Sequence, residues 1–269
     1  MHKIIGVMLL LVAAVCGCSP QAARFSRTYD LNSPKYTIGV QADCDSEYLT
    51  RKIYRDAKVK CFESLETAAK QLMAGKIDAI VYDEHVLRRL MWKYPNRFAF
   101  LSDPVDTDPS VVAVSPKRPE LVEKLNAFIA QYRESGLYDD MFLRWCHDPE
   151  RETDGVEDMP EIPSAPEDAP VLRVGTDCDE EPNSYYDEKG RISGFDTEFC
   201  LRFGAAENVR IEFVCLSENE IYDALEKGEL DFAADNFDYR PDMKKALYTN
   251  GYLDSDVVMM VRAEDAVND

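Results

Sequence analysis

Acidic side chains gather where strand-like runs of this chain end, and these residues are the best candidates for chemistry. Asp83 directly follows the apolar run 77–82, and the polar loop DNFDYRPD follows the run 230–234. A further loop, after residues 171–175, carries the acids Asp177, Asp179, Glu180 and Glu181. Open α/β sheets bind ligands in the loops that follow their strands. The pattern therefore indicates a polar binding site, and its charge would suit a cationic ligand.

The overall charge narrows the class of partner. The 269 residues include 51 Asp and Glu but only 31 Lys and Arg, which gives a formal net charge of −20. Nucleic-acid backbones select basic surfaces, so a nucleic-acid partner is disfavoured. Solubility combined with an acidic tether would explain the same charge without any ligand.

Catalysis has little support in the sequence. Two carboxylates with separated pKa values could do acid–base work. However, the chain shows no nucleophile–His–acid set and no appended catalytic module. We therefore expect no enzymatic activity and no cofactor.

The N-terminus has the pattern of an export signal. Lys3 precedes a short apolar run at 4–15, which is too short to span a membrane as a helix. The following segment resembles the lipobox of bacterial lipoproteins, with Gly17 before Cys18. This resemblance implies a lipid on Cys18 and a place on the periplasmic or extracellular face of the cell envelope. An ordinary signal peptide that happens to contain two cysteines is the alternative.

Strand and helix patterns alternate along the first half of the chain. Strands are expected at 35–44, 59–62, 77–82 and as two pieces within 98–115; helices are expected at 47–57, 64–74, 120–132 and 138–146. Ser64 suits an N-cap, and Gly75 lies just past the end of the same helix. Alternation of this kind predicts an α/β fold with parallel strands.

A linker separates this half from a second one of similar design. Residues 148–170 hold five prolines and nine acids, a composition that cannot build a core. Strands are then expected at 171–175, 210–215, 230–234 and 256–262, and helices at 196–206 and from Ser217 to Gly228. Glu220, three residues after Ser217, completes a capping box.

A weak internal repeat suggests two related lobes and a set of disulfides. Cys61, Gly75, Asp78 and Asp83 recur at nearly the same spacings as Cys215, Gly228, Asp231 and Asn236. Six cysteines lie beyond the export signal, with no CxxC motif and only scattered histidines, so disulfides are expected rather than a metal site. The repeat favours the pairs Cys44–Cys61 and Cys178–Cys215. Elimination leaves Cys146–Cys200, with connectivity open.

Several motifs then resemble a known family, the bacterial extracellular solute-binding proteins of family 3, which serve polar amino-acid uptake. LRVGTD, a loop with Pro182, Tyr185 and Tyr186, DEKGRISGFDTEF and ALEKGELDFAADNF are similar to the family's first lobe. Residues 34–83 resemble its second lobe, and LVEKLNAFIAQYRESGLYDDMFLRW resembles its closing helices. The resemblance implies the two-lobed α/β fold of type II periplasmic binding proteins.

The order of these parts is rotated relative to the family, so we interpret the chain as a circular permutant. The expected parts are a lipoprotein signal peptide (1–18), a tether (19–33), the second lobe (34–103), a closing segment with helices (104–147), the linker (148–170), the first lobe (171–262) and a tail (263–269). Permutation is tolerated where chain ends are exposed and close together. A fragment of a tandem array that swaps halves with a neighbour is the alternative.

The resemblance also implies ligand contacts. Asp83 matches the acid that receives the ligand ammonium, and Arg240 matches the arginine that receives the carboxylate. The same site would include Ser46, Asp177, Tyr185, Tyr186, Asn236 and Asp238. The family's Gly-Ser-Thr turn is replaced by Asp43-Cys44-Asp45, and its covering aromatic falls near Ser184. Either the ligand is basic, or several of these acids stay in water.

The implied function is that of a lipid-anchored binding protein. It would close on a small polar solute, an amino acid or related amine, and deliver it to an ABC transporter or a sensor. Closure would bend the crossovers near 104–109 and 253–257. The alternatives are a degenerate, non-binding module for envelope assembly and an enzyme on the same fold, such as a dehydratase or the regulatory lobe of a lytic enzyme.

Overall fold

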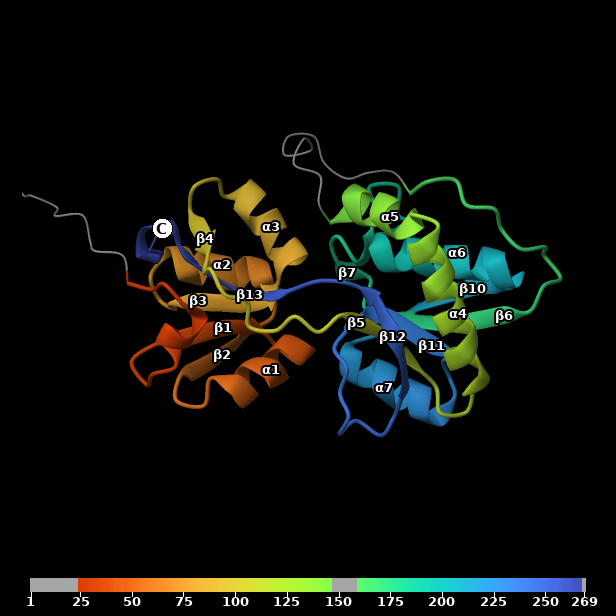
Figure 1. The fold of residues 1–269 in the computed structure, drawn as a ribbon, viewed down its shortest axis with the longest axis horizontal. Coiled ribbons are helices and arrows are strands. Elements are labelled where there is room, and N and C mark those ends of the chain that lie inside the picture. The colour runs from red at the N-terminus through yellow and green to blue at the C-terminus, as the bar shows by residue number, and fades with distance from the viewer. Residues whose placement is uncertain (1–23, 147–158, 268–269) are drawn as a thin grey trace, which may run out of the picture.

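The computed structural model describes residues 24–146 and 159–267, which form two lobes, each built on a five-stranded sheet (Figure 1). The predicted signal peptide, Cys18 and linker residues 148–158 lie outside the described residues. Within the described residues, no helix is both long and apolar enough to cross a membrane. The predicted α/β class and two-lobed architecture are confirmed.

One lobe, which we call the second lobe after its expected place in the family, has the strand order β2-β1-β3-β13-β4. Its strands are β1 (Thr37–Gln41), β2 (Lys58–Phe62), β3 (Ala79–Asp83), β4 (Phe98–Phe100) and β13 (Val257–Arg262). The first three strands are parallel, and β13 runs antiparallel to both β3 and β4. The sheet therefore takes one central strand from the far end of the chain.

Three helices cover this sheet: α1 (Asp45–Ile53), α2 (Leu65–Met73) and α3 (Glu84–Lys93). Leu72 of α2 and Leu87 of α3 share one apolar cluster, whereas Leu49 of α1 packs in another. Sequence patterns did not assign α3, because it begins directly after β3 and only Asp83, an N-cap residue type, marks the change. Asp83 is its N-cap residue but makes no side-chain capping hydrogen bond.

The other lobe, the first lobe, has the order β10-β6-β11-β5-β12. Its strands are β5 (Ser110–Val114), β6 (Val171–Thr176), β10 (Arg210–Cys215), β11 (Phe232–Phe237) and β12 (Leu247–Leu253). A small sheet adds β7 (Asp179–Glu180), β8 (Ser184–Tyr186) and β9 (Ile192–Ser193). Its helices are α4 (Glu120–Glu134), α5 (Leu137–Trp145), α6 (Phe195–Glu207) and α7 (Glu218–Lys227).

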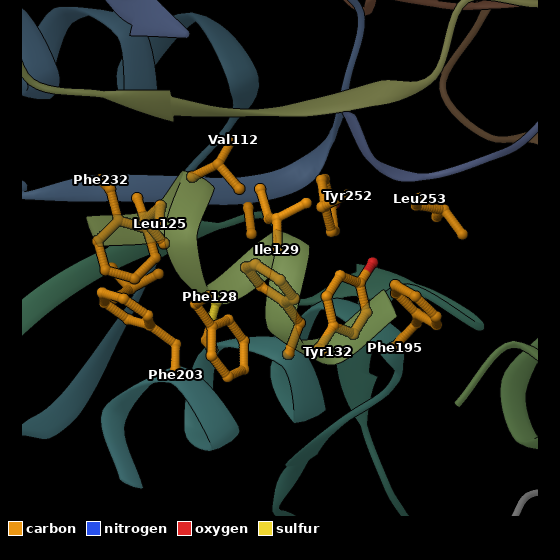
Figure 2. Packing of buried hydrophobic residues seen from close by; sticks show 14 of the residues in the cluster. Val112, Leu125, Phe128, Ile129, Tyr132, Phe195, Phe203, Phe232, Tyr252 and Leu253 are labelled. Carbon is orange, nitrogen blue, oxygen red and sulfur yellow. The ribbon is translucent and has the colours of Figure 1, made fainter. Parts of the chain in front are cut away.

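Aromatic packing holds α4 and α6 on the first-lobe sheet (Figure 2). The Phe128 ring centroid lies 5.4 Å from that of Phe199 and 5.6 Å from that of Phe203. Phe128 belongs to the apolar face predicted for this helix, and all members of that face are buried: Leu121, Leu125, Phe128, Ile129 and Tyr132. Edge-to-face rings at these distances are favourable beyond the area that they bury.

Two crossovers connect the lobes, at residues 101–109 and 254–256. They lie side by side, since the Val105 N–H donates to the Val257 carbonyl at 2.7 Å and the Val257 N–H donates to the Asp106 carbonyl at 3.0 Å. Figure 1 shows the chain passing from β12 of the first lobe to β13 of the second lobe through one of them. One crossover thus leads from the second lobe to strand β5 of the first-lobe sheet, and the other leads from the first lobe to strand β13 of the second-lobe sheet.

The internal repeat has a matching hydrogen-bond pattern in both lobes. Asp78 Oδ2 accepts the Thr37 N–H at 2.9 Å, and Asp231 Oδ2 accepts the Arg173 N–H at 2.8 Å. In each lobe, therefore, the aspartate just before one strand (β3 or β11) holds the backbone of the neighbouring strand (β1 or β6) near its beginning. This arrangement gives the repeated aspartates a structural role.

The predicted tether at 19–33 is corrected for the part that the structure describes. Phe25 and Leu31 are fully buried, and residues Thr28–Leu31 form a short 3₁₀ helix. The Arg24 and Phe25 N–H groups donate to the Asp265 carbonyl at 2.8 and 2.9 Å. These apolar side chains fill the second-lobe core, so residues 24–33 belong to the fold, as do residues 263–267.

Candidate functional site

A crevice between the lobes lies at the carboxyl ends of the central strands and has a volume of about 30 Å³. Its ten lining residues come from both lobes: Cys44, Asp45, Ser46, Tyr82, Asp83, Glu180, Glu218, Asp235, Asn236 and Asp238. The second lobe contributes the start of α1 and the end of β3. The first lobe contributes Glu180 of β7, the start of α7 and the end of β11. This space holds about two water molecules, and the lobes are in direct contact beside it.

Direct hydrogen bonds join the lobes beside this crevice. The Asp45 N–H donates to Glu218 Oε2 at 3.1 Å, and Asp45 Oδ2 accepts the Asp238 N–H at 2.9 Å. Arg240 Nη1 donates to Asp45 Oδ1 at 3.2 Å. Asp45 is therefore the centre of the contact on this side, and it is only 7% exposed.

A second set of contacts closes the opposite side. The Tyr82 hydroxyl donates to Glu180, and Arg89 Nη1 donates to Glu181 Oε1 at 2.6 Å. His85 Nε2 lies 2.7 Å from Asn183 Oδ1. Burial lowers the pKa of His85 to about 4, so its imidazole is neutral at pH 7.

The crevice concentrates carboxylic acids whose pKa values are raised by burial. Burial, followed by the nearby Asp238 and Glu180, raises the pKa of Asp83 well above its usual range. Burial also raises the pKa of Asp238 to about 7 and, with Asp45 adjacent, that of Glu218 to about 9. An uncompensated carboxylate is costly in a place that water leaves. A cation that entered the crevice would therefore displace protons.

The structure brings four of the eight predicted contact residues to the crevice lining: Ser46, Asp83, Asn236 and Asp238. Asp177 lies behind them, where its N–H donates to Asp235 Oδ1 at 3.0 Å. Arg240 reaches the same place through Asp45, and its guanidinium carbon lies 4.4 Å from the centroid of the Tyr48 ring. These six residues form one neighbourhood.

The two tyrosines lie elsewhere. Tyr185 is buried in the first-lobe core, where its ring meets Trp145 edge-on at 6.5 Å. Tyr186 is 58% exposed, and its hydroxyl lies 3.3 Å from Cys215 Sγ. Neither residue lines the crevice. Alternation along β8 sends these neighbours to opposite faces of the small sheet.

Sequence patterns missed several lining residues, above all Asp45, Glu218 and Asp235. Asp45 and Glu218 each lie in the first turn of a helix, where acids are common for reasons of helix stability alone. Asp235 did carry a signal, because it belongs to the polar end of a predicted strand. Only the folded chain places the two helix N-termini face to face.

One predicted disulfide is confirmed, and two are corrected. Cys178 and Cys215 are bonded. Cys44 and Cys61 are free thiols because they lie on opposite faces of the second-lobe sheet, Cys44 toward the α2–α3 cluster and Cys61 toward the α1 cluster.

The remaining pair is also free. Cys146 and Cys200 are buried within the aromatic cluster of the first lobe. Burial raises the pKa of both thiols well above the usual range. Here they pack as small apolar side chains, so elimination from a list of six cysteines was not a sound basis for pairing them.

A metal centre has no support in the part of the chain that the structure describes. No group of three or more His, Cys, Asp or Glu side chains there is arranged to hold a metal ion. The acids of the crevice are directed at one another and at Arg240 instead.

Comparisons with known proteins connect the first lobe to a family. Residues 172–267 match the bacterial extracellular solute-binding proteins, family 3. An arginine-binding periplasmic protein of Mannheimia haemolytica is 27% identical over 132 residues, covering 47% of this chain and 55% of the relative. The chain thus spans about half the length of this curated relative.

Solved structures of similar kind were also found. The L-cystine solute receptor of Neisseria gonorrhoeae is 25% identical, with coverage of 25% of this chain and 29% of the receptor and a TM-score of 0.25. A mutant of ArgBP from T. maritima is 13% identical, with coverage of 86% and 82% and a TM-score of 0.38.

Proposed function

We propose that this chain, whose residues 172–267 match the bacterial extracellular solute-binding proteins of family 3, captures a small polar solute between its two lobes. The solute would be an amino acid or a related amine. One observation carries the proposal: the carboxyl ends of β3 and β11 meet at a single crevice lined from both lobes. Two-lobed binding proteins hold their ligand at such a junction between the lobes and close around it by a hinge motion.

Asp83 is the residue that we assign to the ammonium group of the solute. Its side chain is 7% exposed, lines the crevice and lies opposite the end of β11. A buried carboxylate that receives an ammonium gains a charge-assisted hydrogen bond, and loss of one partner of such a pair costs about 2 kcal/mol or more.

A thermal-shift panel tests the proposal directly. Purified protein is mixed with polar amino acids, polyamines and small peptides, and one class should raise the melting temperature. Asp83→Asn should raise the dissociation constant for that ligand by at least about 30-fold, which corresponds to about 2 kcal/mol of binding free energy. Asp140→Asn, which removes a carboxylate from the exposed side of α5, is the matched control and should bind normally. No shift with any compound would reject solute binding.

Delivery and anchoring complete the proposed role. The solute would pass to an ABC transporter or a sensor at the cell envelope, with Cys18 as the lipid-bearing residue. Metabolic labelling with a radioactive or alkyne-bearing fatty acid should mark the protein, and Cys18→Ala should abolish the label and release the protein from membranes. Retention of the label by Cys18→Ala would refute this assignment.

We also propose that the chain is a circular permutant of the family's usual order. In support, the two described ends lie together, because the Val267 N–H donates to the Phe25 carbonyl at 2.8 Å. Each sheet also takes one strand from the other half of the chain. A re-ordered chain, joined between residues 267 and 24 and opened within the linker, should keep the circular dichroism spectrum and the Cys178–Cys215 bond. Failure of that chain to fold would reject the idea.

A further inference from the structure

Asp45 occupies the position in the crevice where a carboxylate is best received. One of its oxygens accepts from the Arg240 guanidinium at 3.2 Å, and the other accepts from the Asp238 N–H at 2.9 Å. A guanidinium and a backbone N–H, one on each oxygen, form a typical receptor for a carboxylate. Asp45 also lies in the first turn of α1, where the helix N-terminus favours negative charge. The receptor is thus filled by a side chain from the opposite lobe.

Arg240 is held in this arrangement by more than one contact. Its Nη1 lies 3.9 Å from Glu218 Oε1, and its guanidinium carbon lies 4.4 Å from the centre of the Tyr48 ring. Its side chain is only 19% exposed. A ligand carboxylate that took the guanidinium would leave Asp45 buried without its partner, which is strongly unfavourable.

The rest of the crevice offers acceptors for a cation. Six of the ten lining residues are carboxylic acids, and among these described residues none is basic: Cys44, Asp45, Ser46, Tyr82, Asp83, Glu180, Glu218, Asp235, Asn236 and Asp238. Asp238 and Glu180 both lie close enough to Asp83 to raise the pKa of its carboxyl. A positive group would stabilise the ionised forms of these acids, and a second negative group would destabilise them further.

We infer that Asp45 acts as a built-in carboxylate that occupies Nη1 of Arg240 and thereby selects solutes that carry amino or guanidino groups but no carboxylate. This inference rests on the proposed function and specifies its ligand class. Asp45 is then a specificity-determining residue, because it replaces the negative half of an amino acid. The crevice then offers the ligand only the acceptors for its positive group.

Matched pairs of probes test the inference in the wild-type protein. Putrescine and ornithine differ by one carboxylate, as do agmatine and arginine. Isothermal titration calorimetry should give at least one amine a dissociation constant about 10-fold or more below that of its amino-acid partner. Equal affinities, or tighter binding of the amino acid, would overturn the inference while leaving the proposed function intact. Absence of binding by all four probes would overturn the inference, and the thermal-shift panel would then decide the proposed function separately.

The variant Asp45→Asn tests whether Asp45 causes the preference for the amine. Asp45→Asn frees the Arg240 guanidinium from its carboxylate, so the preference for the amine should fall by about 10-fold or reverse. Asp43→Asn is the control, since Asp43 is exposed two residues away and its positive φ of 59° suits asparagine. An unchanged preference in a folded Asp45→Asn protein would overturn the role of Asp45. If that variant does not fold, as judged by circular dichroism, the wild-type pairs decide alone.

Discussion

Replacing Asp196 by asparagine should make the protein more stable, and only toward higher pH. Asp196 lies in the first turn of helix α6 and is 1% exposed. Its Oδ1 accepts the Tyr252 hydroxyl at 2.6 Å, whereas its Oδ2 has no hydrogen-bond partner. Burial therefore raises the pKa of this carboxyl from 3.8 to about 7. Asparagine keeps the shape and the acceptor for Tyr252 but never becomes charged.

The sign and size follow from the two pKa values. Between about pH 4 and pH 7 the unfolded chain loses its proton while the folded chain retains it, so the free energy of unfolding of the wild type falls as pH rises. The loss is complete above about pH 7 and amounts to at most roughly 4 kcal/mol. The advantage of Asp196→Asn over the wild type should therefore grow by up to about 4 kcal/mol between pH 4 and pH 8.

Urea unfolding of both proteins at each pH unit from 4 to 8 measures this difference. At the upper end, thermal scans should place the variant about 8–16 °C higher, because each kcal/mol moves the melting temperature of a domain of this size by about 2–4 °C. Asp254→Asn is the control with opposite sign, since hydrogen bonds from Arg133 lower the pKa of Asp254. A stability difference between Asp196→Asn and the wild type that does not change with pH would refute the reasoning.

Other predictions concern the disulfide and a buried acid. Peptide mapping under non-reducing conditions should find a single linked pair, Cys178–Cys215, among the cysteines of the described residues. Reducing that bond opens a 37-residue separation and should lower the free energy of unfolding by about 4 kcal/mol, seen as a lower urea midpoint; an unchanged midpoint would contradict the loop-entropy argument. Glu198 accepts from Arg144 at 2.9 Å and from the Trp145 indole at 2.7 Å while fully buried. Glu198→Ala should therefore cost about 3–5 kcal/mol in the same assay, and a cost below 1 kcal/mol would show that water replaces the carboxylate.

Sequence patterns predicted most of the local structure. The capping box of Ser217 and Glu220 forms as expected, and Gly228 adopts the predicted left-handed C-cap. The apolar face of α4 is buried as its spacing required. Such features depend on residues within a few positions of each other, so the pattern contains nearly all of the information. Helix α3 is the exception, since only Asp83, an N-cap residue type, separates it from β3.

Register decided which cysteines could pair. Cys215 lies opposite Thr176 in the paired strands, and Cys178 follows Thr176 by two residues. Cys61 lies opposite Val40, and Cys44 follows Val40 by four residues. Counted from the residue opposite the second cysteine, Cys44 thus lies two residues farther along its loop than Cys178 does. Only the pairing of the strands reveals it.

By itself, the sequence determined the α/β class, the two related halves and the acids at the ends of their strands. Asp83 and Asn236 could be singled out because each ends a recognisable strand. The contact between Asp45 and Glu218, 173 residues apart in the chain, was decided by the tertiary structure alone. Closing the lobes brings together two helix N-termini whose acids have an ordinary local explanation. Both acids then contact Arg240, a residue of the first lobe that is near neither of them in the sequence.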